Sequence, residues 1–298
     1  KQQQQQQPVR YISQLSEQHA GQRQPHLIGS MGPSPSPAVE NETNHDVVPQ
    51  LSHTLDGETD KVMEDMLNYF SGHANPAHPL TMRNIICPPS LPTITAALLG
   101  MMENPNLITD DFSGGITKLE LKVVRMIANL LGWPENEAKG VFTFGGSGCA
   151  LYALRLALSQ VYDPHEGLMN VQQKITVIAS ESSHYSILTA ADWLGLGSKN
   201  VRTVPIDHGT LVMNYHKLEE ILEEEFSLQH VVPMIVCTFG STDACAITNV
   251  FQVFSISQRL ANRYHVRRPY LFCDAAIGWS WLHFKGYDWV NNPLQFGH

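Results

Sequence analysis

Short apolar runs alternate with amphipathic stretches over the second half of the chain, and this alternation constrains the fold more than any other feature. The apolar runs predict strands at residues 140–144, 174–179, 201–206, 231–238 and 269–273. The stretches between them have helical spacing, at residues 149–162, 186–194, 215–226 and 250–263. Strands that are apolar throughout and separated by helices are typical of a mainly parallel sheet covered by helices on both faces. The predicted fold class is therefore α/β.

The residues that precede this alternation have a different composition. A polyglutamine tract at 2–7 and a Pro/Ser-rich stretch at 30–38 cannot bury enough apolar surface to offset the entropy of ordering. We therefore expect residues 1–50 to form a disordered arm; an arm that orders on a partner subunit is the alternative. Residues 51–115 are expected to form a helical and loop segment, and residues 116–298 the main domain. The N-terminal helices are predicted over 60–70 and 91–102, with a loop over 72–92.

Thr117 and Glu120 have the spacing of a capping box. In that arrangement the threonine accepts a hydrogen bond from the first turn and the glutamate reaches back to the cap. The pair predicts a helix that starts here and ends at Gly132-Trp133-Pro134.

Composition excludes several classes of function. The chain has 298 residues, 43% of them hydrophobic, which is enough for a substantial core in one or two domains. Its 19 basic residues against 28 acidic ones argue against a nucleic-acid-binding surface. No apolar run is long enough to span a bilayer, so the chain is expected to be soluble. Five cysteines without C-x-x-C spacing indicate reduced core thiols in a cytoplasmic protein and argue against a metal site.

A glycine-rich loop, Gly145-Gly146-Ser147-Gly148, follows the apolar run at 141–144 and precedes a helical stretch. The first N–H groups of a helix have no intrahelical acceptor, and the helix dipole favours an anion there. Gly146 and Ser147 are therefore candidates for binding a phosphate, with the serine adding a hydroxyl donor. An ordinary strand-to-helix turn is the alternative.

Asp274 ends the apolar run at 270–273 and is followed by Ala275 and Ala276. An ionised carboxylate at the end of a buried strand requires a cationic partner, because desolvating it alone is very costly. A pyridinium nitrogen is one such partner, and small neighbours allow a flat ring to approach the strand. With the glycine-rich loop and Ser183-His184, this acid suggests a site for pyridoxal phosphate.

Three further side chains follow predicted strands, where ligands of α/β sheets bind. His184 comes shortly after the strand at 174–179, and its imidazole could stack on a cofactor ring. Ser241 and Thr242 come shortly after the strand at 231–238, with hydroxyls able to contact cofactor or substrate. Taken singly, each of the three also fits an ordinary polar loop.

Taken together and in this order, these motifs resemble those of the group II pyridoxal-phosphate-dependent amino-acid decarboxylases, relatives of the glutamate and aromatic amino-acid decarboxylases. The stretches that carry the resemblance are Ile116-Thr-Lys-Leu-Glu120, Thr143-Phe-Gly-Gly-Ser147, Ser183-His-Tyr-Ser186 and Asp274-Ala-Ala276. The resemblance covers residues 68–289. It implies the fold type I of pyridoxal-phosphate enzymes, carbon–carbon lyase activity on an amino acid, and an obligate dimer.

The resemblance also implies a role for each matching residue. Gly146 and Ser147 would hold the cofactor phosphate, and His184 would stack on the ring. Asp274 would keep the ring nitrogen protonated, which maintains the ring as an electron sink. Ala276 would pack near the ring, with Ser241 and Thr242 beside cofactor or substrate. On this reading His184 and Asp274 are the catalytic residues, and no metal is involved.

The sequence departs from the family pattern at two places. Gly148-Cys149 stand where relatives often have Glu-Ala after the phosphate-binding serine. The Schiff-base lysine, which the family carries a few tens of residues after the aspartate, has no match, because Lys285 is too close to Asp274 and reads as a surface residue. We therefore expect the lysine to lie outside this sequence or on a complementary chain. Another lyase of the same fold and a non-catalytic subunit are the alternatives.

Overall fold

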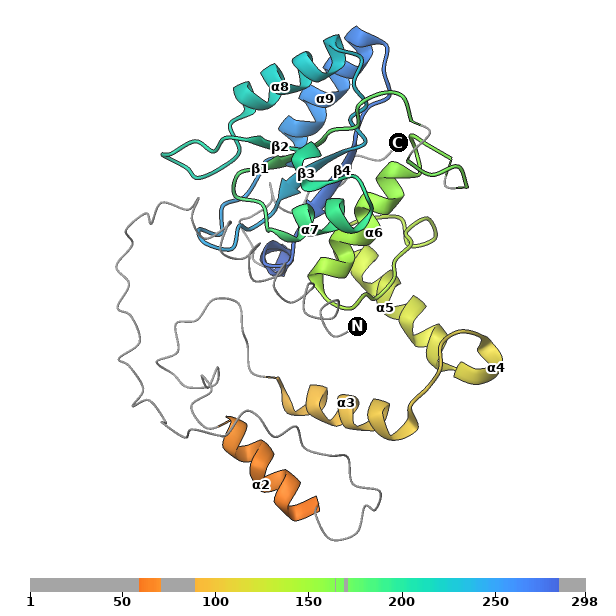
Figure 1. The fold of residues 1–298 in the computed structure, drawn as a ribbon. Helices are drawn as coiled ribbons and strands as arrows, with labels where there is room; N and C mark the ends of the chain where they lie inside the picture. The colour runs from red at the N-terminus through yellow and green to blue at the C-terminus, as the bar shows by residue number, and fades with distance from the viewer. Residues whose placement is uncertain (1–58, 71–88, 164, 169–170, 284–298) are drawn as a thin grey trace, which may run out of the picture. The chain divides into compact units, whose positions relative to one another are not determined.

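The computed structural model describes residues 59–70, 89–163, 165–168 and 171–283 (Figure 1). The chain divides into two compact units, with the boundary between Asn75 and Pro76. In the first unit the described residues form helix α2 (Thr59–Phe70), as predicted. The predicted arm at 1–50, most of the predicted loop at 72–92, and Lys285 lie outside the described residues. The predicted domain boundaries at 50 and 115 stay predictions.

Four strands in the second unit form a parallel sheet, which confirms the predicted fold class. They are β1 (Val177–Ser180), β2 (Val201–Val204), β3 (Met234–Thr238) and β4 (Tyr270–Asp274), in the spatial order β2-β1-β3-β4. All three pairings are parallel, and β4 pairs with β3 over its full length, from Met234 opposite Tyr270 to Thr238 opposite Asp274. Parallel neighbours require crossover connections, and helices supply them here.

The helices lie on both faces of the sheet (Figure 1). They are α6 (Gly146–Leu158), α7 (Ser186–Trp193), the 3-10 turn η2 (Ser198–Asn200), α8 (Tyr215–Ser227) and α9 (Val250–Tyr264). Asn214 caps α8 by accepting from the Lys217 N–H, and Asn249 caps α9 by accepting from the Gln252 N–H.

Alternate residues of each buried strand belong to two different cores. Ile178 and Ile235 pack with α8 and α9, whereas Val177 and Val236 pack with α6 and α7. Because successive strand side chains point to opposite faces, this division means that both faces of the sheet are covered. It also explains why the strands read as continuous apolar runs in the sequence.

The predicted capping box is wrong. Helices α3 (Leu91–Glu103), α4 (Asp110–Ser113) and α5 (Ile116–Leu130) precede the sheet, and Gly115 caps α5 without a side-chain hydrogen bond. Thr117 therefore lies inside the helix, where its hydroxyl pairs with that of Ser113 at 2.6 Å. Glu120 does not reach back; its Oε1 accepts the backbone N–H of Phe142 at 3.1 Å.

The predicted strand at 140–144 does not form either. A strand needs a neighbour for its main-chain groups, and none of the described residues pairs with this segment as a strand. The Phe142 N–H instead donates to Glu120 on α5. The Phe142 and Phe144 side chains are exposed, unlike the side chains of the central strands.

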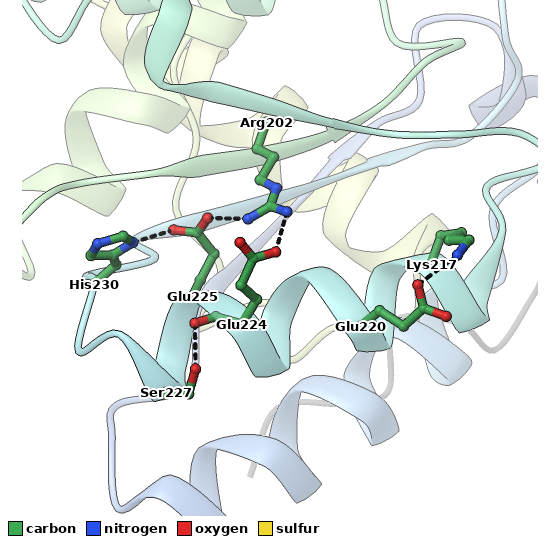
Figure 2. A network of polar contacts seen from close by, with 7 residues as sticks. All are labelled: Arg202, Lys217, Glu220, Glu224, Glu225, Ser227 and His230. Atoms are coloured by element: carbon green, nitrogen blue, oxygen red, sulfur yellow. Dashed lines mark hydrogen bonds and ion pairs between the residues drawn. The ribbon is translucent and has the colours of Figure 1, made fainter.

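A buried carboxylate joins the edge strand β2, helix α8 and the segment that leads into β3 (Figure 2). Glu225 is fully buried; its Oε1 accepts from Arg202 Nη1 at 2.6 Å and its Oε2 from His230 Nδ1 at 2.9 Å. Arg202 also pairs with Glu224, which is half exposed. Burial by itself would raise the pKa of the Glu225 carboxyl, but its hydrogen bonds, led by that from Arg202, hold the pKa below the ordinary value of 4.5.

Glu225→Gln is expected to lower the free energy of unfolding by about 2–3 kcal/mol, because a neutral amide replaces the buried carboxylate that joins Arg202 to His230, and Arg202 keeps only its half-exposed partner Glu224. Urea unfolding at pH 7 measures this change. Since the folded-state pKa is depressed, the ionised network stabilises the fold above pH 4.5, and this contribution is lost as pH falls through the folded-state pKa. The variant should lack that part of the pH dependence. Glu224→Gln, at the half-exposed partner, is the control and should cost less than about 1 kcal/mol; equal losses in the two variants would contradict the prediction.

Candidate cofactor site

Strands β1, β3 and β4 end at the same edge of the sheet, at Ser180, Thr238 and Asp274. The chain leaves β1 through α7 toward β2, and leaves β3 through α9 toward β4. These two connections run in opposite directions, with α7 on one face and α9 on the other. The point where strand order reverses in an open α/β sheet is where ligands bind, outside the carboxyl ends. Here that point lies between β1 and β3.

A hydroxyl bridge joins the two loops at this reversal point. Ser183 Oγ, in the loop after β1, lies 2.9 Å from Thr238 Oγ1 at the buried end of β3. Thr238 is in register with Asp274, and the Phe239 N–H donates to the Asp274 carbonyl at 2.8 Å. The loop that carries His184 is thereby fixed to the strand pair that carries Asp274. Sequence reasoning named Ser183 as part of a motif but did not predict its bridge, and it missed Thr238, although a threonine at the end of an apolar run is a visible signal.

The Asp274 carboxylate is half-buried and has no ion pair among the described residues. Its Oδ1 accepts a long hydrogen bond of 3.4 Å from the Ala276 N–H, two residues later in the same turn. The side chain is thus less buried than the sequence predicted. The rest of its hydrogen-bonding capacity is available for a donor or a cation from a ligand.

His184 lies in the loop directly before α7, and its orientation is fixed from that helix. The Ser186 N–H donates to Nδ1 at 3.2 Å. Nδ1 therefore acts as an acceptor, and the neutral ring carries its proton on Nε2. The ring is half-buried and tilted against Tyr185, with centroids 4.2 Å apart.

Helix α6 begins at Gly146, three residues before the predicted start, so Gly146 and Ser147 occupy its first turn. The preceding Gly145 has φ +100°, a conformation that side-chain-bearing residues rarely adopt. Cys149 makes the first hydrogen bond of the helix, to the Gly145 carbonyl at 3.2 Å. The earlier N–H groups of the turn have no intrahelical acceptor and can donate to an anion.

Gly148, where the sequence departs from the family pattern, has a steric explanation. A Cβ at this position would lie 2.8 Å from Thr143 Cβ and 3.0 Å from its hydroxyl. That hydroxyl donates to the Gly145 carbonyl at 2.8 Å and contacts Cys149 Sγ at 3.2 Å. A larger residue at 148 would displace this support of the glycine-rich loop.

The direction of α6 brings its first turn to the carboxyl edge of the sheet. Just beyond the C-terminus of α6, the Gln160 carbonyl accepts from Arg267 Nη1 at 3.0 Å, and Arg267 precedes β4. The end of α6 therefore lies at the amino edge. Its 13 residues extend about 20 Å, so its start lies toward the opposite edge, where Asp274 ends β4 (Figure 1).

The predicted residues Ser241 and Thr242, after β3, and Ala276, after β4, differ in their exposure to solvent. Ser241 is buried, and its Oγ accepts from the Ala246 N–H at 3.1 Å within its own loop. Thr242 and Ala276 are exposed. Ser241 thus shapes the loop, while Thr242 and Ala276 are accessible from solvent.

The turn after Asp274 packs tightly against the end of β3. A Cβ on Gly278 would lie 2.2 Å from the Phe239 carbonyl oxygen, which accepts the Gly278 N–H at 3.0 Å. Gly240, with φ +99°, faces the same turn. Sequence reasoning missed Gly278, and its place four residues after Asp274 was the only signal.

Cysteines contribute less to the core than the sequence predicted. Cys237 is buried and Cys273 is half-buried, but Cys149 and Cys245 are exposed. Within the described ranges, no cluster of three or more His, Cys, Asp or Glu side chains could hold a metal ion. No helix in the same ranges has the length and apolar character needed to cross a membrane.

Comparison with known proteins identifies similar sequences. A family model described as the pyridoxal-dependent decarboxylase conserved domain matches residues 45–284. L-2,4-diaminobutyrate decarboxylase of Acinetobacter baumannii is 26% identical over 219 residues, which cover 67% of this chain and 40% of that protein. Cysteine sulfinic acid decarboxylase of Rattus norvegicus is 32% identical over 196 residues, which cover 62% of this chain and 37% of that protein. The chain therefore spans about two fifths of the length of these curated relatives.

Solved structures share the fold. The crystal structure of mouse CSAD in apo form matches with a TM-score of 0.71 at 22% identity, covering 83% of this chain and 50% of that chain. The crystal structure of Oryza sativa TDC with PLP matches with a TM-score of 0.66 at 19% identity, covering 97% of this chain and 59% of that chain. These neighbours confirm the predicted fold type.

Gly278→Ala is expected to lower the free energy of unfolding by about 2 kcal/mol or more, because the added methyl group meets a backbone carbonyl that is fixed by β3. The urea unfolding midpoint measures the effect. Gly115→Ala, in open space at the start of α5, is the matched control and should change stability by less than about 1 kcal/mol. An equal, small effect in both variants would show that the turn after Asp274 tolerates displacement.

Proposed function

Because the chain belongs to the pyridoxal-dependent decarboxylase family, we propose that the protein carrying it decarboxylates an amino acid with pyridoxal phosphate as cofactor. The observation that carries the proposal is the half-buried Asp274 without an ion pair among the described residues, at the same sheet edge as the first turn of α6. When bound, pyridoxal phosphate supplies an electron-accepting ring for the electron pair left on the α-carbon as carbon dioxide departs.

The residues at this edge fit the parts of the cofactor. Ser147 and the first-turn N–H groups of α6 offer donors to the phosphate. Asp274 offers a carboxylate that would keep the ring nitrogen protonated, by a charge-assisted hydrogen bond. His184, held through Nδ1, would present its ring face to the cofactor and keep the Nε2 proton for a polar partner. Thr242 and Ala276, exposed on neighbouring loops, would complete the wall, with Ser241 supporting its loop.

The substrate is proposed only as an amino acid. The names of the relatives include both cysteine sulfinic acid and 2,4-diaminobutyrate, which differ in side-chain charge. The lysine that attaches the cofactor in this family is expected outside the printed sequence, and this expectation stays a prediction. The free thiols of Cys237 and Cys273, at paired positions of β3 and β4, favour a reducing compartment such as the cytoplasm.

Helix α3 supports the proposal that the protein is a homo-oligomer. It is apolar over most of its 13 residues, yet none of its side chains is buried. Leu98, Leu99, Met101 and Met102 are each more than half exposed. Apolar surface of this extent on a helix is typical of an interface. We propose that a second copy of the chain covers it.

Asp274→Asn is expected to lower turnover on the order of 100-fold or more, because the neutral amide no longer stabilises a protonated ring nitrogen. The variant should also retain less cofactor, measured as pyridoxal phosphate that co-elutes with the protein on gel filtration. Asp111→Asn, on an exposed side chain of α4, is the control and should match the wild type in both measurements. Near-normal turnover and cofactor retention in Asp274→Asn would refute the pyridinium role.

Leu98→Glu with Met102→Glu is expected to convert the oligomer to monomers, because two charges on one helix face oppose its burial. Sedimentation velocity measures the change. Lys199→Glu, a charge change at an exposed polar position, should leave the oligomer intact. If the double variant still sediments as the wild-type oligomer, α3 is not in the interface.

A further inference from the structure

Thr238 lies directly beside Asp274, and both side chains point to the same face of the sheet. The two residues are in register on β3 and β4. Val236 and Phe272, each two residues earlier on the same strands, pack with α6 and α7. Because strand side chains alternate between the two faces, Thr238 and Asp274 also point to the face that α6 and α7 cover.

The position of Thr238 relative to Asp274 is fixed by the main chain. Thr238 is buried, and its carbonyl accepts the Thr248 N–H at 2.9 Å. The next N–H, that of Phe239, donates to the Asp274 carbonyl at 2.8 Å. The Thr238 hydroxyl therefore stands on a rigid part of the sheet, one strand away from the carboxylate.

The main-chain pairing of β1 with β3 ends before this point. Its last pair is Ala179 opposite Val236, whereas the pairing of β3 with β4 continues to Thr238 opposite Asp274. The end of the β1–β3 ladder coincides with the reversal point, where ligands of open α/β sheets bind. Beyond Val236, the ladder does not set the distance between the loop after β1 and the end of β3.

The loop after β1 is attached to the β1–β2 side of this point. The Glu181 N–H donates to the Val204 carbonyl at the end of β2, at 2.8 Å, and the Glu181 carboxylate accepts the Ile206 N–H at 3.3 Å. The His184 ring is held from α7, by the Ser186 N–H. These contacts fix the ring relative to β1 and β2, but Asp274 belongs to the opposite side, with β3 and β4.

The hydroxyl bridge between Ser183 Oγ and Thr238 Oγ1, 2.9 Å long, joins these two sides. Ser183 directly precedes His184, and Thr238 is the neighbour of Asp274 across the ladder. We propose that Ser183 and Thr238 are positioning residues, which set the spacing between the His184 ring and the Asp274 carboxylate so that one flat cofactor ring contacts both. The inference rests on the proposed function. A spacing that is set before binding lowers the ordering cost of binding.

Thr238→Val tests the proposal, because it removes the hydroxyl and nearly keeps the shape of the side chain. The dissociation constant for pyridoxal phosphate, measured by equilibrium dialysis of the full protein freed of cofactor, should rise about threefold to tenfold, the range that the net free energy of one hydrogen bond gives. Thr238→Ser keeps a hydroxyl and should bind nearly as the wild type does.

Ser183→Ala removes the other half of the bridge and should weaken binding to the same extent. The double variant should bind no more weakly than either single variant, because both substitutions remove the same hydrogen bond. Ser183 is half-buried, so this variant keeps the test decisive if Thr238→Val does not fold. Ser182→Ala is the matched control and should bind as the wild type does: Ser182 Oγ lies 3.0 Å from Ser180 Oγ, a hydroxyl pair that stays on the β1 side.

Hydrogen–deuterium exchange of the cofactor-free protein separates the positioning role from the proposed function. Peptides that cover residues 181–187 should exchange faster in Thr238→Val than in the wild type or Ser182→Ala, while peptides from α8 exchange alike in all three. Unchanged exchange in the loop, or additive effects of the two bridge substitutions on cofactor binding, would overturn the positioning role. A wild-type protein that binds no pyridoxal phosphate would instead refute the proposed function, and the exchange comparison would still decide whether the bridge holds the loop.

Discussion

The pairing of four parallel strands is the constraint from which the rest of the structure follows. Parallel neighbours cannot be joined by tight turns, so each connection must cross a face of the sheet as a helix. Both faces are then covered, and the strands become apolar on both sides. The carboxyl ends of β1, β3 and β4 necessarily meet at one edge, and the polar residues after them become neighbours although they are far apart in the sequence. The candidate site is thus a consequence of the topology as much as of its residues.

The carboxylates of Glu225 and Asp274 have different roles because their surroundings differ. Glu225 is buried more deeply, yet an arginine and a histidine satisfy it, and it joins β2, α8 and the entry to β3. Asp274 is partly open and receives one long hydrogen bond from its own turn. Glu225, whose hydrogen bonds are satisfied within the protein, stabilises the fold. Asp274, which can accept further hydrogen bonds, is positioned to bind a ligand.

The strands and helices from residue 146 onward were predictable because burial on both faces leaves a direct pattern in the sequence. The two failures share a physical cause. Residues 140–144 have the composition of a strand, but composition does not reveal whether a neighbour is present, and Glu120 bonds to that segment instead of capping α5. The structural roles of Ser183, Thr238 and Gly278 escaped prediction because they depend on distances between neighbouring strands and loops, which no local spacing encodes.

The Ser183–Thr238 bridge also has a consequence for how the chain folds. The two residues are 55 positions apart, and β2, α8 and β3 must form between them before their hydroxyls can meet. Closing a loop of that length costs entropy that only the completed sheet offsets. We therefore expect the loop that carries His184 to become fixed late in folding, after β3 has paired with β1. A partly folded chain would have helices and a core but no ordered binding edge, so cofactor binding would select the fully folded chain.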